Sequence, residues 1–296
     1  MTSTPSPLLE LVQASARQLD AAGLHFGHGT SNAFDEAAWL VLWQLGLPLD
    51  TDLDDTASHT PPSPAQVQAV QELIAQRITT RKPAAYLTQE AWLQGVPFYV
   101  DERSIVPRSL IAELIADATL DVWLGTHTQR VLDLCTGNGS LAILAALAWP
   151  DVQVDAADIS PDALAVATIN RERHGLQQRV RLIESDGLNQ LQGQRYDLVL
   201  CNPPYVNAQS MASLPAEYRA EPSLALAGGS DGMDFIRQLF QHLPEHLNEQ
   251  AIVVLEIGHE RAFFEAAFPT LPVTWLDTSA GDSQVLLIEA GDLRHH

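Results

Sequence analysis

The sequence predicts an α/β fold with a mostly parallel sheet, preceded by a small helical domain. From about residue 130 onward, short apolar strand patterns alternate with helical patterns. Repeated βα units of this kind imply parallel strands with helices on both faces of the sheet. The N-terminal region instead shows the apolar spacing of amphipathic helices. We therefore expect a helical domain over residues 1–82, a linker with a β-hairpin over 83–107 and an α/β domain over 108–296.

The composition is typical of a globular protein. The 296 residues are 46% hydrophobic and 18% charged, which suits one large or two ordinary domains. No uninterrupted apolar run reaches the roughly 18 residues of a membrane span. The N-terminus also lacks the basic-then-apolar pattern of a signal peptide, so we expect a cytoplasmic protein. Cys135 and Cys201 lack metal-ligand spacing, and we expect reduced thiols, no disulfide between them and no metal site.

The formal net charge of −21 argues against a nucleic-acid-binding function. Domains that bind nucleic acids usually carry a basic stripe, and this sequence has none. We therefore expect no direct sequence-specific contact with nucleic acid. Strong acidity serves solubility, but it also suits a basic protein partner through electrostatic complementarity. Composition alone leaves both interpretations open.

Three N-terminal segments have the apolar periodicity of helices. They are Ser6–Ala22, the segment from a Ser31 or Asn32 cap to Gly46, and Ala65–Arg81. The acidic stretch Asp50–Pro64 contains three prolines and is predicted to be a linker. Short extended pieces around Gly95, within Tyr86–Val100, predict a β-hairpin.

The remaining sequence alternates between strand and helix patterns. Strands are predicted at Arg130–Cys135, Val152–Asp158, Val180–Glu184 and Tyr196–Cys201. Helices are predicted at Leu110–Leu124, at Leu141–Ala148 and from Ser160-Pro161 onward. The alternation continues through Asp231–Leu247, Ala251–Ile257, Glu260–Phe268, Val273–Asp277 and Gln284–Glu289.

Asn202-Pro203-Pro204-Tyr205 follows a predicted buried strand and is the first candidate site. Both prolines lack an N–H and have a fixed φ, so the turn is stiff. Open α/β sheets bind ligands at the carboxyl ends of their strands. The Asn202 amide both donates and accepts hydrogen bonds, and Tyr205 offers a flat face. This combination suits a planar substrate group bearing an NH2, whereas a proline-terminated surface loop is the alternative.

The loop Thr136-Gly137-Asn138-Gly139 follows the first predicted strand and suits close approach of a ligand to the backbone. Ala142 replaces the last glycine of the full dinucleotide fingerprint, and a phosphate-gripping lysine is absent. The ligand therefore need not carry a pyrophosphate. A plain tight turn is the alternative interpretation of this loop.

Acidic residues accompany the predicted strand ends. Asp158 stands 19 residues after Gly139, where an acidic side chain can bind both ribose hydroxyls. Asp186, in Ser185-Asp186-Gly187, is placed for an adenine amino group. Each acid alone is more often a cap or turn former. Together with Asp133, the glycine loop and Asn202–Tyr205, they favour a nucleoside-containing ligand at one edge of the sheet.

This series resembles the class I S-adenosylmethionine-dependent methyltransferases, and Asn202–Tyr205 resembles the motif of those that methylate a planar NH2 nitrogen. Four further stretches resemble the protein-glutamine methyltransferases. They are Arg81–Thr88, Phe98–Ile115, Glu221–Asp234 and Glu256–Gly258. The resemblance, over about residues 80–290, implies a Rossmann-like fold and S-adenosylmethionine as cofactor, with S-adenosylhomocysteine as product. It also implies that the helical domain recognises the substrate.

Two stretches resemble the branch that methylates a glutamine of large-subunit ribosomal protein L3. That branch typically carries Val-Pro-Arg-Ser-Pro-Ile-Ala-Glu-Leu-Ile and Leu-Asp-Leu-Cys-Thr-Gly, which residues 106–115 and 132–137 match apart from Leu110. Asn138-Gly139-Ser140 replaces the usual Ser-Gly-Cys, and both departures are compatible with the local geometry. The sibling branch methylates the Gly-Gly-Gln loop of release factors and typically carries Pro-Arg-Pro-x-Thr-Glu. That substrate, amino methylation of a nucleic-acid base, and a non-catalytic binding module are the alternatives.

The resemblance also assigns roles to residues. The N–H groups of the target amide would donate to the Asn202 side-chain oxygen and the Pro203 carbonyl, and Tyr205 would pack against the amide. Pro204 completes the catalytic motif, and Arg108 is a further candidate for substrate binding. The candidate cofactor-binding residues are Asp133, Cys135, Thr136, Gly137, Asn138, Gly139, Asp158, Ile159, Asp186, Gly187 and Asn202. A basic ribosomal protein as partner would also suit the acidic charge.

Overall fold

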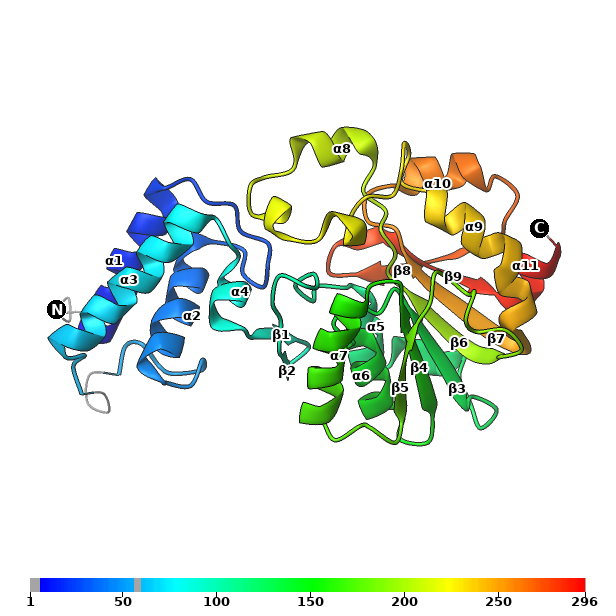
Figure 1. Cartoon of the computed structure of the whole chain (residues 1–296), viewed down its shortest axis with the longest axis horizontal. Coiled ribbons are helices and arrows are strands. Elements are labelled where there is room, and N and C mark those ends of the chain that lie inside the picture. The colour runs from blue at the N-terminus through cyan, green and yellow to red at the C-terminus, as the bar shows by residue number, and fades with distance from the viewer. Residues whose placement is uncertain (1–5, 56–59, 296) are drawn as a thin grey trace. The chain divides into compact units, whose positions relative to one another are not determined.

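The computed structural model describes residues 6–55 and 60–295, which divide into two compact units. The first unit comprises Met1–Glu90 and Pro215–Ala220, and the second comprises Ala91–Leu214 and Glu221–His296 (Figure 1). The boundary after Glu90 falls within the predicted linker 83–107. The N-terminal stretch 1–5 and residues 56–59 of the predicted proline-containing linker lie outside the described residues.

Helices form the first unit. Within its described residues they are α1 (Pro7–Ala21), α2 (Ala33–Leu45), α3 (Pro64–Thr80) and the short α4 (Ala84–Thr88). The three longer helices agree with the predicted ones to within two residues. The side chains of Ser6, Asn32 and Ser63 each accept a hydrogen bond from a first-turn N–H, which satisfies groups that a helix start leaves unpaired.

A segment from much later in the chain, Pro215–Ala220, packs within the same unit. The Glu217 carboxylate accepts a hydrogen bond from Arg81 at 3.2 Å, and its side chain is 2% exposed. The ring of Tyr218 lies 4.4 Å from that of His28, measured between centroids. The sequence did not predict that this segment belongs to the helical unit.

The second unit begins with the predicted hairpin. Its strands, β1 (Ala91–Leu93) and β2 (Val96–Phe98), pair antiparallel around Gly95. The prediction placed Tyr86–Thr88 in extended pieces as well, and this was wrong because these residues lie in helix α4.

The helix predicted over Leu110–Leu124 is divided in two. It consists of α5 (Ile111–Ala116) and the 3-10 turn η1 (Thr119–Val122). Ala118 lies between them with a left-handed φ of 61°. A left-handed residue ends an α-helix, so the apolar pattern continued past the true end of the helix.

One sheet of seven strands organises the described part of the second unit, in the order β5-β4-β3-β6-β7-β9-β8. The strands are β3 (Arg130–Leu134), β4 (Gln153–Asp158), β5 (Val180–Glu184), β6 (Tyr196–Cys201), β7 (Leu247–Glu256), β8 (Thr274–Thr278) and β9 (Gly281–Glu289). Strands β5, β4, β3, β6 and β7 are parallel, and β9 pairs antiparallel with β7 and β8. The mostly parallel sheet was predicted correctly. Its strand order reverses between β3 and β6, where α/β sheets bind ligands.

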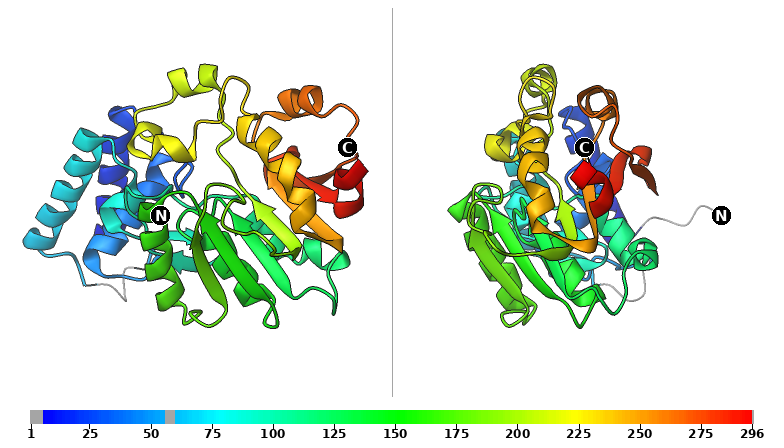
Figure 2. Two further views of the ribbon diagram at one scale, coloured as in Figure 1. Left: turned by 45° about the vertical axis from the view of Figure 1, so that its right-hand side comes forward. Right: turned by 90° about the vertical axis from the view of Figure 1, so that its right-hand side faces the viewer.

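Helices cover both faces of this sheet. One apolar core includes α5 and α6 (Ser140–Ala148), and the other includes α9 (Asp234–His242) and α10 (Arg261–Ala267). Figure 2 shows the gold helix α9 lying along the strands. The other helical elements are α7 (Pro161–Arg173), α8 (Ala208–Ser213), α11 (Ala290–His295), η2 (Tyr218–Ala220), η3 (Ser223–Ala225) and η4 (Leu243–His246).

The helix predicted over Asp231–Leu247 corresponds to α9 followed by η4. Pro244 stands at the start of η4 and lacks the N–H that an α-helical hydrogen bond needs. The apolar spacing could not show this change of helix type. Over residues 6–55 and 60–295, none of the helices is both long and apolar enough to cross a membrane.

Candidate active site at the carboxyl ends of the parallel strands

A cavity of about 240 Å³ opens at the carboxyl ends of β3, β4, β5 and β6. The predicted site residues that line it are Cys135, Gly137, Asp158, Ile159, Asp186, Gly187, Asn202 and Pro204. Parallel strands end at the same edge of a sheet, which explains why residues from four separate loops meet here. The prediction did not include the lining residues from outside these loops, among them Arg103, Ile105 and Phe235.

Asp133 lies beneath the glycine loop and does not line the cavity. Its carboxylate accepts hydrogen bonds from the Thr136 hydroxyl and the Ala142 N–H, so it ties the loop to the first turn of α6. Burial raises the pKa of Asp133 to about 7. Its Oδ1 atom has no hydrogen-bond partner in the described structure. Asp133 and Thr136 therefore shape the loop, of which Cys135 and Gly137 line the cavity.

Asn138 and Gly139 also help to fix the conformation of the loop. The Asn138 side chain accepts the Ser140 N–H, and its backbone carbonyl accepts a hydrogen bond from Asn170 on α7. Gly139 has a φ of 81°, and a Cβ there would lie 3.2 Å from the Cβ of Ala167. The close approach of α6 to α7 therefore favours glycine at this position.

Asp158 joins two walls of the cavity. Its Oδ2 accepts the Gly137 N–H at 2.8 Å, and its Oδ1 accepts the Ser160 N–H at 2.9 Å. Burial raises the pKa of this carboxyl. Each oxygen of a carboxylate can accept more than one hydrogen bond, so both retain capacity for the hydroxyl groups of a ligand.

Asn202 also lines a second cavity, of about 320 Å³, together with Pro203, Tyr205 and Arg108. The two cavities share Asn202 and so meet at the carboxyl end of β6. In the described part of the chain, the Asn202 side chain forms no hydrogen bond to another residue. Its amide is therefore available to a ligand on either side.

Two glycines close to Tyr205 explain why the stretches Glu221–Asp234 and Glu256–Gly258, which were noted above only for their resemblance to the family, contain glycine. A Cβ on Gly258 would lie 2.5 Å from Cε2 of Tyr205, and one on Gly228 would lie 2.7 Å from the Pro204 carbonyl oxygen. Real side chains do not reach such distances. Gly258 and Gly228 therefore allow the Pro-Pro-Tyr turn to pack directly on the backbone.

Glu256, the last residue of β7, was missed as a site residue. Its Oε2 accepts hydrogen bonds from the Ser109 hydroxyl at 2.6 Å and the Leu110 N–H at 2.9 Å, and its Oε1 accepts the Tyr205 hydroxyl at 3.2 Å. Burial raises the pKa of Glu256. The sequence did contain a signal for this role, because Glu256, in the motif Glu256-Ile-Gly258, is an acidic residue at the end of an apolar strand.

Arg108 is held in an ion pair. Its two terminal nitrogens donate to Glu221 at 2.6 and 2.7 Å, and the Glu221 side chain is fully buried. Glu221 also accepts the Val106 N–H. Arg108 lines the second cavity, but its positive charge is already matched by that carboxylate.

Cys135 and Cys201 lie at the ends of the neighbouring strands β3 and β6. Both thiols are free. The pKa of Cys135 is raised, first by its hydrogen bond with Cys201 and then by burial. Over residues 6–55 and 60–295, no group of three His, Cys, Asp or Glu side chains is placed to hold a metal ion.

The chain matches the Methyltransferase small domain family over residues 112–218. It is 50% identical to the ribosomal protein uL3 glutamine methyltransferase of Burkholderia pseudomallei (strain K96243), with coverage of 99% of this chain and 98% of that relative. The proteins of the same name from Bordetella pertussis and Neisseria meningitidis serogroup B are 51% and 47% identical. They cover 95% and 94% of this chain, and the matches span 94% and 91% of their own lengths.

Solved structures resemble the chain at lower identity. The hMettl16 catalytic domain in complex with MAT2A 3′UTR hairpin 6 has a TM-score of 0.50 and 13% identity, covering 76% of this chain and 81% of that one. A likeness at this identity supports the fold alone. The class I methyltransferase fold was therefore predicted correctly.

Proposed function

The chain belongs to the family of ribosomal protein uL3 glutamine methyltransferases, and from this premise we propose that it methylates the side-chain amide nitrogen of a glutamine in ribosomal protein uL3. S-adenosylmethionine is the methyl donor and S-adenosylhomocysteine the product. The observation that carries the assignment is the meeting of two cavities at Asn202. Methyl transfer requires a donor site and an acceptor site that share one reaction centre.

The residues of the first cavity fit S-adenosylmethionine. Asp158 keeps acceptor capacity for the two ribose hydroxyls, and Asp186 offers an acceptor for the adenine amino group. Ile159 and Phe235 supply apolar wall. Two carboxylates also suit a ligand that carries a positive sulfonium. When bound, this cofactor supplies an activated methyl group.

The second cavity receives the glutamine side chain. An amide nitrogen is a weak nucleophile because its lone pair is delocalised into the carbonyl. The Asn202 side-chain oxygen and the Pro203 carbonyl accept its two N–H bonds and direct the nitrogen toward the first cavity. With the methyl donor bound, the nitrogen–carbon bond would form as the carbon–sulfur bond breaks, the electron pair of that bond would stay on sulfur, and one amide proton would pass to water. Holding the nitrogen in line with the methyl group removes the entropic cost of bringing the two together. The reaction therefore needs neither a strong base nor a metal.

Tyr205 forms a wall of the acceptor cavity, and its neighbours keep it in place. The Glu256 carboxylate accepts its hydroxyl, and Gly258 permits its ring to lie against the backbone. Arg108, held by Glu221, lines the same cavity and is retained as a candidate contact for the substrate backbone. Its ion pair limits that contact to the N–H groups which Glu221 does not use.

The substrate is a basic ribosomal protein, and the enzyme carries a net charge of −21. Opposite net charges speed encounter and favour the correct partner. Because the substrate is a ribosomal protein, we place the reaction in the cytoplasm.

The proposal is tested with labelled S-adenosylmethionine and three purified acceptors: uL3, a peptide-chain release factor and ribosomal RNA. We expect label on uL3, mapped by mass spectrometry to a glutamine side chain. Label on the release factor would keep the chemistry but contradict the substrate. Label on RNA alone would contradict the acceptor class.

A further inference from the structure

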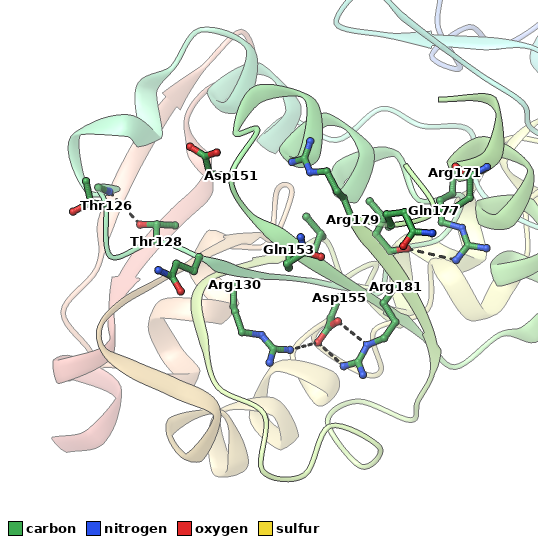
Figure 3. Close-up of a pocket in the computed structure, with 15 residues that line it drawn as sticks. Thr126, Thr128, Arg130, Asp151, Gln153, Asp155, Arg171, Gln177, Arg179 and Arg181 are labelled. Atoms are coloured by element: carbon green, nitrogen blue, oxygen red, sulfur yellow. Dashed lines mark hydrogen bonds and ion pairs between the residues drawn. The ribbon is translucent and has the colours of Figure 1, made fainter. Parts of the chain in front are cut away.

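A large cavity lies at the opposite edge of the same sheet. It has a volume of about 870 Å³ and is formed where β3, β4 and β5 begin, so it shares no residue with the candidate active site. Four arginines line it, Arg130, Arg171, Arg179 and Arg181, with only two acids, Asp151 and Asp155 (Figure 3). The whole chain contains 16 Lys and Arg residues and has a net charge of −21. A quarter of its cations therefore face one cavity.

Asp155 orients two of these arginines but does not use all of their N–H donors. Its Oδ2 lies 2.7 Å from Nη2 of Arg130 and 2.8 Å from Nη2 of Arg181, and Figure 3 shows both guanidinium groups converging on it. The Asp155 side chain is 7% exposed, whereas those of Arg130 and Arg181 are 39% and 58% exposed. A guanidinium has five N–H donors, so each of these arginines keeps donors that face the solvent side.

The other two arginines are not matched by acids. Over the described residues, neither Arg171 nor Arg179 forms an ion pair, and their Nε atoms are buried without a hydrogen-bond partner. Nη2 of Arg179 donates to the Trp149 carbonyl at 2.7 Å, and Nη1 of Arg171 donates to the Val180 carbonyl at 3.5 Å. Neutral carbonyls fix these side chains but leave their positive charge uncompensated.

We propose that this cavity binds a compact phosphate-bearing ligand, of the nucleotide class. Guanidinium groups match phosphate oxygens in geometry and charge. The rest of the wall offers neutral hydrogen-bonding groups suited to hydroxyls and a base, from Thr126, Gln129, Gln153, Gln177 and Gln178. The volume lies in the range of small-molecule sites. Arginines held in place before binding also reduce the entropic cost of association.

The acidity of the remaining surface favours a compact ligand over an extended polyanion. Charges separated by more than about 8 Å are largely screened at physiological ionic strength. A nucleotide keeps its phosphates within the arginine cluster, whereas an RNA strand would continue across surface of the same sign. The site does not depend on the proposed methyl transfer, because it lies at the other edge of the sheet.

The test is isothermal titration of the full-length protein, kept at saturating S-adenosylhomocysteine so that the first cavity is filled, with pyrophosphate, ATP, adenosine and a short single-stranded RNA. We expect pyrophosphate and ATP to bind, and adenosine and RNA to bind at least about tenfold more weakly, because phosphates must reach the arginines. Absence of pyrophosphate and ATP binding, or preferential binding of RNA, would overturn the proposal.

Two single variants, Arg171→Gln and Arg181→Gln, locate the site. Each should weaken pyrophosphate binding by about tenfold, which corresponds to the loss of one charged hydrogen bond. Arg17→Gln is the matched control, because it removes the same charge from an exposed position on α1. Equal affinity in all three variants would place any binding outside this cavity and overturn the proposal. The urea unfolding transition of each variant, compared with that of the wild type, reports whether the variant is folded.

Discussion

The Tyr205 hydroxyl donates a hydrogen bond to Oε1 of Glu256 at 3.2 Å, although the two residues are 51 positions apart. The other oxygen of Glu256 accepts the Ser109 hydroxyl and the Leu110 N–H. Glu256 thus connects the start of α5 to the aromatic wall of the acceptor cavity. It is a positioning residue, because it acts on the substrate through Tyr205.

Replacement of Glu256 by Gln should slow methyl transfer. The amide of Gln cannot accept all three hydrogen bonds, and each one lost costs about 1 kcal/mol. We expect kcat to fall about fivefold to tenfold in Glu256→Gln and in Tyr205→Phe. A double-mutant cycle of these two changes should be non-additive, since both break the same contact. Fully additive effects on kcat would refute the positioning role.

Gly258→Ala should lower both stability and turnover. The left-handed φ of 54° costs a non-glycine residue about 1 kcal/mol, and the new Cβ would also press on the Tyr205 ring. Gly193→Ala is the control, because Gly193 has a φ of 75° and a Cβ added there would meet nothing within 4 Å. Both variants should lose stability in urea unfolding, but only Gly258→Ala should lose kcat. Equal kcat in the two variants would contradict this contact.

The Asp133 carboxyl makes stability depend on pH. Its pKa is about 7 in the folded chain and about 3.9 when unfolded, so the folded state binds the proton more tightly. The contribution is fully present below about pH 4 and is lost as the pH rises toward 7, with a slope approaching 1.4 kcal/mol per unit. Asp133→Asn removes this titration, and its unfolding free energy should fall less between about pH 5 and pH 7.5 than that of the wild type. Identical slopes would contradict the burial of a titrating carboxyl here.

The Arg108–Glu221 ion pair should matter for stability. Arg108→Ala leaves the buried Glu221 carboxylate without this cation, at a cost of about 3 kcal/mol in unfolding free energy. Adding Glu221→Gln should restore part of that loss because a neutral amide is less costly to bury.

Substrate kinetics of the same double variant separate the two roles of Arg108. A KM for uL3 that stays raised after stability recovers would support a direct substrate contact. A KM that recovers together with stability would limit Arg108 to holding Glu221. Unchanged stability in Arg108→Ala would contradict the ion pair itself.

Sequence patterns were sufficient for features that depend on one segment or on the common edge of a parallel sheet. The helix cap, predicted at Ser31 or Asn32 and found at Asn32, is a local signal, and the strand-end positions of Asp158, Asp186 and Asn202 converge in any parallel sheet of this order. The predicted strands therefore brought several of the candidate cofactor-binding residues to one edge of the sheet.

Contacts between distant segments could not be predicted in the same way. Arg108 and Glu221 are 113 residues apart, and no periodicity links them. The packing of Glu217 in the helical unit depends equally on tertiary structure. The buried partner of Arg108 was therefore not visible in the sequence, and its candidate role as a substrate contact stays a prediction. The arginine cavity was missed because its cations come from the starts of two strands, β3 and β5, and from the end of α7.

The central claim is that Asn202 directs the target nitrogen toward the methyl donor. Its most direct test is the single-turnover rate of methyl transfer to uL3, at saturating S-adenosylmethionine, in the wild type, in Asn202→Ala and in Asn189→Ala. Asn189 is an exposed asparagine in a turn after β5 and serves as the control. We predict a loss on the order of 100-fold in Asn202→Ala alone, because alignment and hydrogen bonding of the amide are removed together. A rate in Asn202→Ala close to that of the wild type would contradict the mechanism.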